Sequence, residues 1–458
     1  MRISAWLFAA ALVGAAFGAS PSNVTFDRDV LPLLEKNCQT CHRPGEIGPM
    51  PLLTYQQVRP WAKAIRAAVL QHKMPPWHAD PNFGHFANDR SLSEADVKTL
   101  VAWIDNGTPE GSPKNAPKPL VFSDGWRIGE PDLVIEMPLA YNVPVTGIVN
   151  YQYIIVPSGF TEDKWVQAVE VRPGNRGVVH HAVLYSREPG GEYAAAAPKG
   201  EFFELAKYYK VTSRPKDERM FSAVSEPEHL QVYAPGADPI QLGPGQARLI
   251  KAGSDIIFEM HYTPNGTATT DRTKVGFIFA KQPVKERVHT IRINNGSILS
   301  IPPNEPDYRM QSQVYLTQDV RVIAFQPHMH LRGKSMEFSA VYPSGESEVL
   351  LRVPKYDFHW QMSYYLAQPK LLPKGTLFIC KASWDNSPNN PNNPHPEKRV
   401  RGGFQSEDEM FAGFVDLGIA PGLADLKFFK DAPPEAVPQI ITNTTADSLA
   451  KTISGGQN

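Results

Sequence analysis

The chain has 458 residues, enough for about two to four domains, and 42% of them are hydrophobic, which excludes wholesale disorder. Its 46 basic and 47 acidic residues leave a net charge of −1, which excludes a global field that attracts nucleic acid or acidic membranes. The 43 prolines disfavour a mainly helical protein, and three cysteines are too few for a disulfide scaffold.

The N-terminal residues have the pattern of an export signal. A short basic start precedes small and apolar residues from Ile3 to Phe17, and the small-x-small segments 16–18 and 18–20 both suit cleavage. The alternative, a membrane anchor, needs about 20 apolar residues, which is more than this run supplies. We therefore expect residues 1–20 to be a signal peptide and the mature protein to be periplasmic or extracellular, without a membrane span.

A C-x-x-C-H pattern follows a helical stretch. Cys38 and Cys41 can form thioethers with the vinyl groups of a haem, and His42 is then placed to bind the iron. A zinc site would need a second ligand pair, but no other cysteine lies within 300 residues, and a redox C-x-x-C would need a βαβ context. The pattern therefore predicts a covalently bound c-type haem.

The second iron ligand must come from further along the chain. A helix predicted from near Pro60 to Gln71 ends at a K-M-P-P-W segment, and Met74 within it is our choice. The competing ligands are three nearby histidines, namely His72, His78 and His85. A third helix begins at Ser93, with Asp96 three residues later, and stops at Gly107.

Three short helices around a covalent haem resemble a cytochrome c domain, and the K-M-P-P-W segment resembles cytochrome modules fused to other exported enzymes. We expect this domain to span residues 21–112. The proline-bearing segment 113–119 then reads as a linker.

Residues 120–430 read as many short strands separated by turns that contain Pro and Gly, which predicts antiparallel sandwiches. Examples of the expected strands are 151–156, 165–171, 178–185, 255–262, 320–325 and 336–342. This length suits two sandwiches, 120–283 and 284–430, followed by a tail at 431–458. The expected fold class is thus multi-domain and mainly β, with a small all-α domain first.

Five histidines lie in apolar strand contexts of this region. His328 and His330 form an H-x-H, so a strand would point both to one side. His180 and His181 are adjacent, so they could share a metal only through local distortion or through different ring nitrogens, and His261 lies in a third strand. Together they predict a metal site, although imidazole serves zinc, copper, iron and nickel alike.

Four motifs follow one another along the chain: H-H, a single H before an aromatic residue, H-x-H, and then D-E-M. This order resembles the copper type II, ascorbate-dependent monooxygenases. That family includes the peptidylglycine α-hydroxylating and dopamine β-monooxygenases. The resemblance implies two jelly-roll sandwiches of eight or nine strands, each holding one copper ion. It implies an electron-transfer copper on His180, His181 and His261. It also implies an oxygen-activating copper on His328, His330 and Met410, with three other methionines as rivals, namely Met329, Met336 and Met362.

The sequence also departs from that family. The animal enzymes are rich in disulfides, whereas Cys380 has no partner here and is expected to be a buried apolar side chain. The peptide-amidating relatives carry an arginine and a tyrosine that help to hold the peptide carboxylate. Gln326 and Phe414 stand at those positions, so a C-terminal glycine peptide is a doubtful substrate.

The resemblance and the haem motif together predict an exported monooxygenase that hydroxylates a C–H bond with dioxygen. Its cofactors would be two copper ions and one c-type haem. The haem would supply electrons to the copper ions, either in place of ascorbate or a redox protein or alongside them. The substrate would be a small molecule or peptide. Two other hypotheses are a non-catalytic haem and copper electron carrier on the same scaffold, and a sandwich that binds a ligand such as a glycan.

Overall fold

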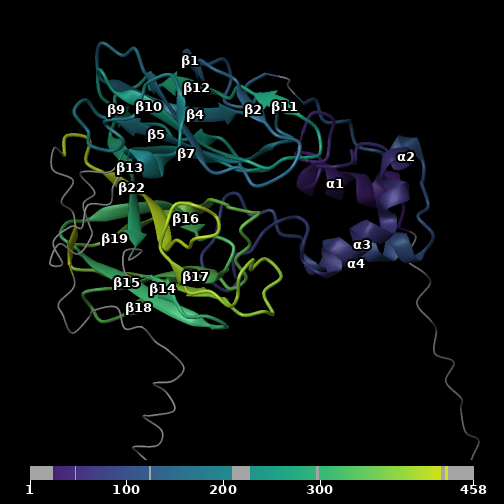
Figure 1. Ribbon diagram of the computed structural model, residues 1–458. Coiled ribbons are helices and arrows are strands. Elements are labelled where there is room, and N and C mark those ends of the chain that lie inside the picture. The colour runs from purple at the N-terminus through teal and green to yellow at the C-terminus, as the bar shows by residue number, and fades with distance from the viewer. Residues whose placement is uncertain are drawn as a thin grey trace, which may run out of the picture.

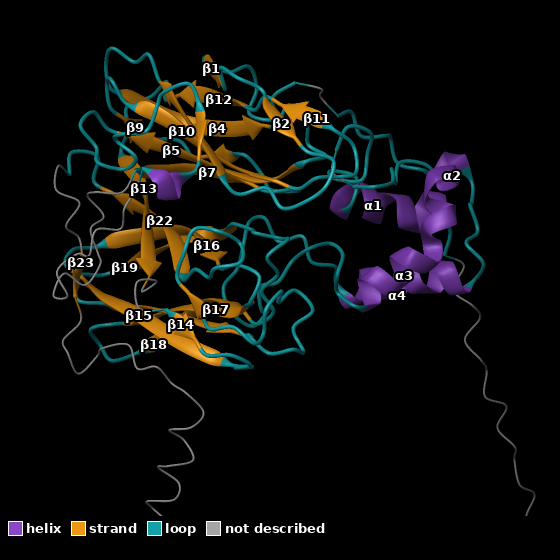
Figure 2. Cartoon of the chain, in the orientation of Figure 1, coloured by secondary structure: helices purple, strands orange, loops and turns teal. Residues whose placement is uncertain are grey.

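The structure is a computed structural model that describes residues 24–46, 48–122, 125–208, 227–294, 299–423 and 429–431. The chain is mainly β, with a few short helices at one side of stacked sheets (Figures 1 and 2). The expected signal peptide and nearly all of the expected tail lie outside the described residues. Within the described part, no helix is long and apolar enough to cross a membrane.

The N-terminal helical unit has its own apolar core, in which Phe26, Val58, Leu100 and Trp103 are buried. Its helices are α1 (Leu31–Asn37), α2 (Tyr55–Val58), α3 (Ala62–Leu70) and α4 (Glu94–Asp105), with single turns η1 (Phe26–Val30), η2 (Arg59–Trp61) and η3 (Pro113–Asn115). Together, η2 and α3 form the helix that the sequence predicted from near Pro60 to Gln71.

Helix α4 begins and ends where its sequence signals predicted. The Ser93 hydroxyl accepts the amide N–H of Asp96 at 3.1 Å, and the Asp96 carboxylate accepts the amide N–H of Ser93 at 3.2 Å, which satisfies two free donors of the first turn. Gly107 follows the helix with a φ of +83°, a conformation that glycine adopts without strain.

Two sheets of the first β unit enclose one core, in which Val169 and Phe277 meet Ile154, Leu184 and Phe258. One sheet has the order β1 (Leu133–Glu136), β12 (Lys274–Phe279), β4 (Lys164–Arg172) and β9 (Gln246–Ile250), with β8 (Ile240–Gln241) beside β4. The other has the order β6 (Phe202–Phe203), β3 (Gln152–Pro157), β10 (Asp255–Tyr262), β5 (Val179–Arg187) and β7 (Glu228–Tyr233). A small pair, β2 (Tyr141–Val143) and β11 (Thr269–Asp271), and the turn η4 (Leu205–Lys207) complete the unit.

The second β unit is built in the same way around a core that includes Phe325, Phe338, Phe378 and Val415. One sheet has the order β13 (Glu286–Asn294), β22 (Ala412–Ile419), β16 (Val320–His328) and β19 (Tyr364–Leu372). The other has the order β18 (Ser347–Val353), β17 (Gly333–Val341), β20 (Leu377–Trp384), β15 (Tyr308–Leu316) and β23 (Phe429–Asp431), and β14 (Ser300–Ile301) pairs with β21 (Val400–Arg401). Cys380 is fully buried in this core, as predicted.

The two β units share a sheet. Strands β9 and β13 pair in parallel, with Glu286 beside Gln246 and Arg287 beside Ala247, so that one nine-stranded sheet runs through both units. The expectation of purely antiparallel sandwiches is therefore wrong at this point. The predicted break near residue 283 does fall between β12 and β13, but hydrogen bonds of the backbone continue across it.

The helical unit contacts both β units. Arg90 bonds to Asp238 of the first unit at 2.9 Å. On the second unit, Phe86 forms an isolated bridge with Leu366, and the amide N–H of Asp80 donates to the carbonyl of Arg352 at 2.8 Å. The unit is thus held at two places rather than tethered by the linker alone.

Candidate metal centre

The first histidine cluster combines neighbouring strands of one sheet. His180 and His181 come from β5 and His261 from β10, and one potential ligand atom of each lies within 4.8 Å of the others. Nδ1 of His181 is 3.0 Å from Nδ1 of His180 and 3.4 Å from Nδ1 of His261. The structure therefore brings together the three residues that the family resemblance assigned to one metal.

A β-bulge explains how two adjacent histidines face the same point. His261 pairs with His181, but the next residue, Tyr262, pairs with Val179, so His180 is the extra residue of β5. A bulge bends the strand and re-aims one side chain, which a regular strand would send to the opposite face. This is the local distortion that the adjacent pair required.

Burial keeps these histidines neutral. It lowers the pKa of His180 to about 4 and that of His261 to about 3, and it lowers the pKa of His181 well below the usual value, with the neighbouring imidazoles adding to the shift. A neutral imidazole offers a nitrogen lone pair, which is the form that binds a metal.

The cluster fits a metal ion better than it fits an apo hydrogen-bond network. Two imidazole nitrogens each about 2.0 Å from one ion lie about 2.8–3.5 Å apart, which spans the two Nδ1 separations at His181. Nδ1 of His181 faces Nδ1 of both His180 and His261, and a single proton on it could form a good hydrogen bond to only one of them. In addition, Nε2 of His181 is buried without a hydrogen-bond partner among the described residues.

Two aromatic neighbours of this cluster carry no sequence motif. His359, in the loop after β18 of the second unit, places Nδ1 3.4 Å from Nε2 of His180. Tyr151 stacks on His261 with ring centroids 4.5 Å apart and an interplanar angle of 21°. Sequence reasoning missed both because each reaches the cluster only through the tertiary fold.

The second histidine pair lies where β16 ends. The rings of His328 and His330 are 5.3 Å apart. Nδ1 of His328 is 2.7 Å from Oε1 of Gln361, and Nδ1 of His330 is 3.3 Å from the main-chain oxygen of Asp408. Because an oxygen accepts at Nδ1 of each ring, Nδ1 carries the proton and Nε2 keeps the lone pair. Burial lowers the pKa of His328 to about 4 and that of His330 well below its usual value, so both are neutral.

A buried carboxylate holds the backbone around this pair. Oε2 of Glu409 accepts the amide N–H of His330 at 3.0 Å, the amide N–H of Met410 at 3.1 Å and the indole N–H of Trp384 at 3.0 Å. Oε1 accepts the amide N–H of Arg332 at 2.6 Å. Burial raises the pKa of Glu409 to about 7, although the hydrogen bonds from the three backbone N–H groups lower it. The third predicted ligand, Met410, is therefore anchored to the same oxygen as His330.

Two aromatic rings lie between the clusters. Tyr151 is 6.5 Å from His330 as well as 4.5 Å from His261, measured between centroids. Phe358 is 6.2 Å from His330 and 5.4 Å from His180. Both rings are almost completely buried.

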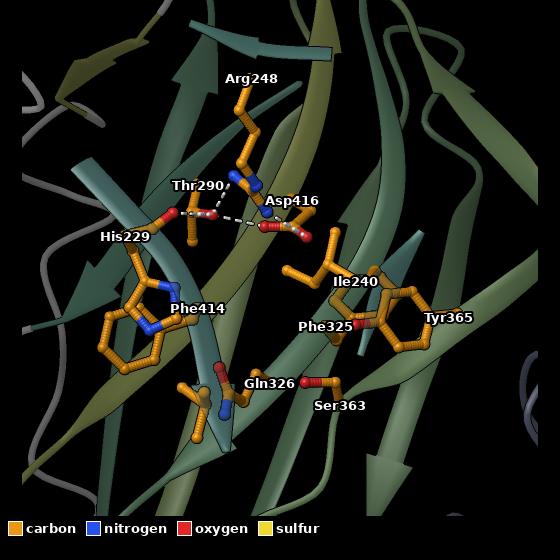
Figure 3. A pocket seen from close by; sticks show the side chains of 12 residues that line it. His229, Ile240, Arg248, Thr290, Phe325, Gln326, Ser363, Tyr365, Phe414 and Asp416 are labelled. Carbon is orange, nitrogen blue, oxygen red and sulfur yellow. Dashed lines mark hydrogen bonds and ion pairs between the residues drawn. The ribbon is translucent and has the colours of Figure 1, made fainter. Parts of the chain in front are cut away.

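A small cavity of about 20 Å³, enough for a water molecule, lies beside His328, between strands of both β units (Figure 3). Its walls include Gln326 and Phe414, which pair across β16 and β22. The Phe414 ring is 6.2 Å from the ring of His328, so the cavity borders the second pair. The one arginine among its lining residues, Arg248, bonds to Asp416 at 2.8 Å, which leaves the cavity no uncompensated cation.

The C-x-x-C-H residues form a turn at the end of α1. The amide N–H groups of Cys41 and His42 donate to the carbonyl of Cys38 at 3.1 and 2.9 Å. Nδ1 of His42 lies 3.1 Å from the carbonyl oxygen of Met50, which assigns the lone pair to Nε2. Two free thiols and one available imidazole nitrogen on a single turn fit covalent haem attachment.

The second iron ligand stays a prediction. The amide of Met74 donates to the carbonyl of Ala68 at 3.4 Å, and none of its described contacts involves His42. Of the competing histidines, His78 is half-buried, and its Nε2 has no partner among the described residues. Burial lowers the pKa of His78.

Comparisons with known proteins bear on the second β unit. No curated protein shows significant sequence similarity to the chain. Two solved structures of the infectious bursal disease virus, the VP2 subviral particle and derived T=1 particles, align at 10% and 11% identity. They cover 66% and 71% of this chain and 75% and 85% of their own, with TM-scores of 0.18 and 0.15, which are too low to inform fold or function.

A family model does match residues 292–416, described as the copper type II ascorbate-dependent monooxygenase, C-terminal domain. The matched segment runs from β13 to β22 and includes His328, His330 and Met410. That segment is therefore similar to the C-terminal domain of the copper type II ascorbate-dependent monooxygenases, which are a class of oxidoreductases.

Proposed function

We propose that the protein is an exported copper monooxygenase that hydroxylates a C–H bond with dioxygen and receives electrons through an N-terminal c-type haem domain. The observation that carries this proposal is the meeting of two buried, neutral histidine sets on either side of Tyr151 and Phe358. The family match over 292–416 supports the same chemistry. Copper bound at these two sets would supply the one-electron redox chemistry that the activation of dioxygen needs.

The chain's own residues would prepare both sites. His180, His181 and His261 would hold one copper, and His328, His330 and Met410 the other. A thioether is a soft ligand that favours Cu(I), the form that meets dioxygen. Glu409 fixes the backbone of His330 and Met410, while Gln361 fixes the proton on His328.

We place the substrate on the side of His328 where the small cavity lies, which would have to widen to admit it. Phe414 and Phe325 supply apolar walls, and Gln326 supplies an amide that can donate and accept. Because Arg248 is already paired with Asp416, a substrate carboxylate would find no free cation there. We infer an uncharged substrate with a hydrogen-bonding group, in keeping with the loss of the arginine found in peptide-amidating relatives.

The N-terminal residues support the remaining parts of the proposal. The basic and apolar start of the chain would direct export to the periplasm or the outside of the cell, which is where c-type haem and copper would be loaded. Cys38 and Cys41 of the turn would bind the haem covalently, and His42 would bind its iron. Ascorbate or a redox protein would reduce that haem, or the copper directly.

Metal content and oxygen uptake on protein matured with haem test the proposal. We expect two copper ions and one iron per chain, and oxygen uptake with a reductant. Replacing Met410 with leucine removes the sulfur at similar volume and should abolish uptake while the haem spectrum stays unchanged. Met336→Leu, in the core of the second unit, is the matched control and should retain uptake. Protein that binds zinc, or no copper, would contradict the proposal.

A further inference from the structure

The histidine pair of the second unit lies where its strand loses its neighbours. Strand β16 pairs with β19 only as far as Phe325 and with β22 only as far as His328. Met329 and His330 therefore follow the last rung of both ladders. Met329 is nevertheless fully buried, and buried main-chain N–H and C=O groups need hydrogen-bond partners. Something other than the sheet must hold the backbone between the two histidines.

Tyr356 supplies both of these partners. Its hydroxyl accepts the amide N–H of Met329 at 3.2 Å and donates to the carbonyl oxygen of Met329 at 2.8 Å. In an antiparallel sheet, two residues of a hydrogen-bonded pair exchange the same two kinds of bond. One side-chain hydroxyl thus takes the place of a strand neighbour, at the residue that separates His328 from His330.

The ring of Tyr356 is itself held by a strand of the core. The amide N–H of Tyr356 donates to the carbonyl of Lys334 in β17 at 2.9 Å. A Cβ added at Gly333 would lie 2.8 Å from Cδ1 of Tyr356 and 2.6 Å from Cβ of Met329, so the ring occupies space that this glycine leaves open. Because β17 pairs with β18 on one side and β20 on the other, it gives the hydroxyl a fixed position.

Glu409 holds the residues that come next. Its carboxylate accepts the amide N–H groups of His330 and Arg332, and the amide N–H of Gly333 donates to the carbonyl of His330 at 3.0 Å. Between Met329 and Arg332 the backbone is therefore bound by two side chains from different elements. Glu409 fixes the second histidine, and Tyr356 fixes the residue that links it to the first.

The segment that carries Tyr356 also bears other partners of the histidines. It is the loop between β18 and β19, residues 354–363, and it brings Gln361 to Nδ1 of His328. The bond of Tyr356 to Met329 therefore ties this loop to the backbone of the pair. The same bond helps to keep Gln361 in reach of His328, so that the orientation of the ring and the position of its backbone are set together.

We propose that Tyr356 is a positioning residue of the second histidine pair. Its hydroxyl binds Met329 and so sets the relation between the rings of His328 and His330, whose centroids are 5.3 Å apart at an interplanar angle of 84°. The inference deepens the proposed function and rests on it, because it concerns how well the pair holds copper. Tyr356 supplies no ligand and acts through the backbone of Met329 alone.

Copper titration followed by EPR tests the proposal with Tyr356→Phe, which keeps the ring and removes only the hydroxyl. Variant and reference both carry His261→Ala, so that the second pair dominates the Cu(II) signal. We expect binding about 10–100-fold weaker and a changed hyperfine splitting. The control is Tyr342→Phe, which removes a hydroxyl that donates to Glu348 at 2.6 Å beyond the opposite end of β17 and should change neither. Unchanged affinity and spectrum in Tyr356→Phe would overturn the proposal.

Hydrogen–deuterium exchange of the unaltered, metal-free protein tests the contact without depending on the folding of any variant. The amide of Met329 lies outside both ladders, yet it should exchange as slowly as the amides within β16, because the Tyr356 hydroxyl accepts its proton. In Tyr356→Phe the same amide should exchange faster. Exchange of Met329 in the unaltered protein at the rate of an open loop would overturn the proposal.

These measurements separate this inference from the proposed function. If the unaltered protein binds no copper, both fail together. If it binds copper and takes up oxygen, but Tyr356→Phe matches its reference in affinity and spectrum, only the positioning role of Tyr356 is wrong.

Discussion

Oε1 of Gln361 lies 2.7 Å from Nδ1 of His328 and assigns the proton of that imidazole to Nδ1. Gln361→Leu removes the acceptor, so we expect copper to bind the second site about 10–100-fold more weakly. Gln361→Glu keeps an oxygen in place and should bind nearly as well as the unaltered protein. Titration with copper followed by EPR measures the affinity. Equal affinity for the leucine variant would show that His328 needs no such partner.

His359 reaches from the second β unit to the first cluster, with Nδ1 3.4 Å from Nε2 of His180. This contact holds the His180 ring in the orientation that turns its Nδ1 toward His181, whichever of the two imidazoles donates the proton. In His359→Ala we expect about tenfold weaker binding at the first cluster and a changed EPR hyperfine splitting. His395→Ala, which alters an exposed histidine paired with Glu397, should change neither.

Glu259 gives the unfolding free energy a defined pH dependence. Burial raises the pKa of Glu259 from 4.5 to about 7, although the Tyr185 hydroxyl donates to it at 3.0 Å. Between these pH values the folded state binds more protons than the unfolded state, so this residue lowers stability as the pH rises. The free energy of unfolding of Glu259→Gln minus that of the unaltered protein should therefore be about 1–3 kcal/mol larger at pH 8 than at pH 5.

Urea denaturation of metal-free protein at both pH values measures this difference. The control is Glu94→Gln, on the exposed face of α4, which should show no such change because water already solvates that carboxylate. A Glu259→Gln variant whose relative stability is the same at pH 5 and pH 8 would contradict the prediction.

Gly413 leaves room for a neighbouring sulfur. A Cβ at this position in β22 would lie 2.7 Å from Sγ of Cys380 and 2.8 Å from the Phe338 ring. Gly413→Ala should therefore lower the free energy of unfolding by about 1–3 kcal/mol through overpacking. In combination with Cys380→Ala, which vacates part of that volume, the loss should be smaller than the sum of the two single effects. Thermal and urea unfolding of the four proteins measures the coupling, and additive losses would contradict it.

Local sequence signals predicted the elements well. The range 255–262 is the whole of β10, and the Ser93–Asp96 capping box opens α4, because alternation and capping depend on neighbouring residues alone. Apolar strand contexts predicted a metal site among five histidines, and the resemblance to the copper monooxygenases grouped three of them in the first cluster. Their convergence depends on the bulge at His180, which lies in the pairing of β5 with β10.

Long-range relationships were beyond the reach of the sequence. The parallel pairing of β9 with β13 joins segments on either side of β10, β11 and β12, and no residue pattern marks it. Gln361 and His359 reach the histidines from a loop that has no motif. The position of Tyr151 and Phe358 between the clusters likewise depends on how the two β units meet.

The shared sheet determines how a substrate can reach the metal centre. If the two β units were joined only by a hinge, they could swing apart and admit a bulky molecule. Parallel strand pairing at Glu286 and Arg287 resists such opening because it would break backbone hydrogen bonds. Entry must then depend on side-chain rotation and loop movement around the cavity. Such a narrow gate would admit small molecules or the thin end of a longer chain, and it would turn folded macromolecules away.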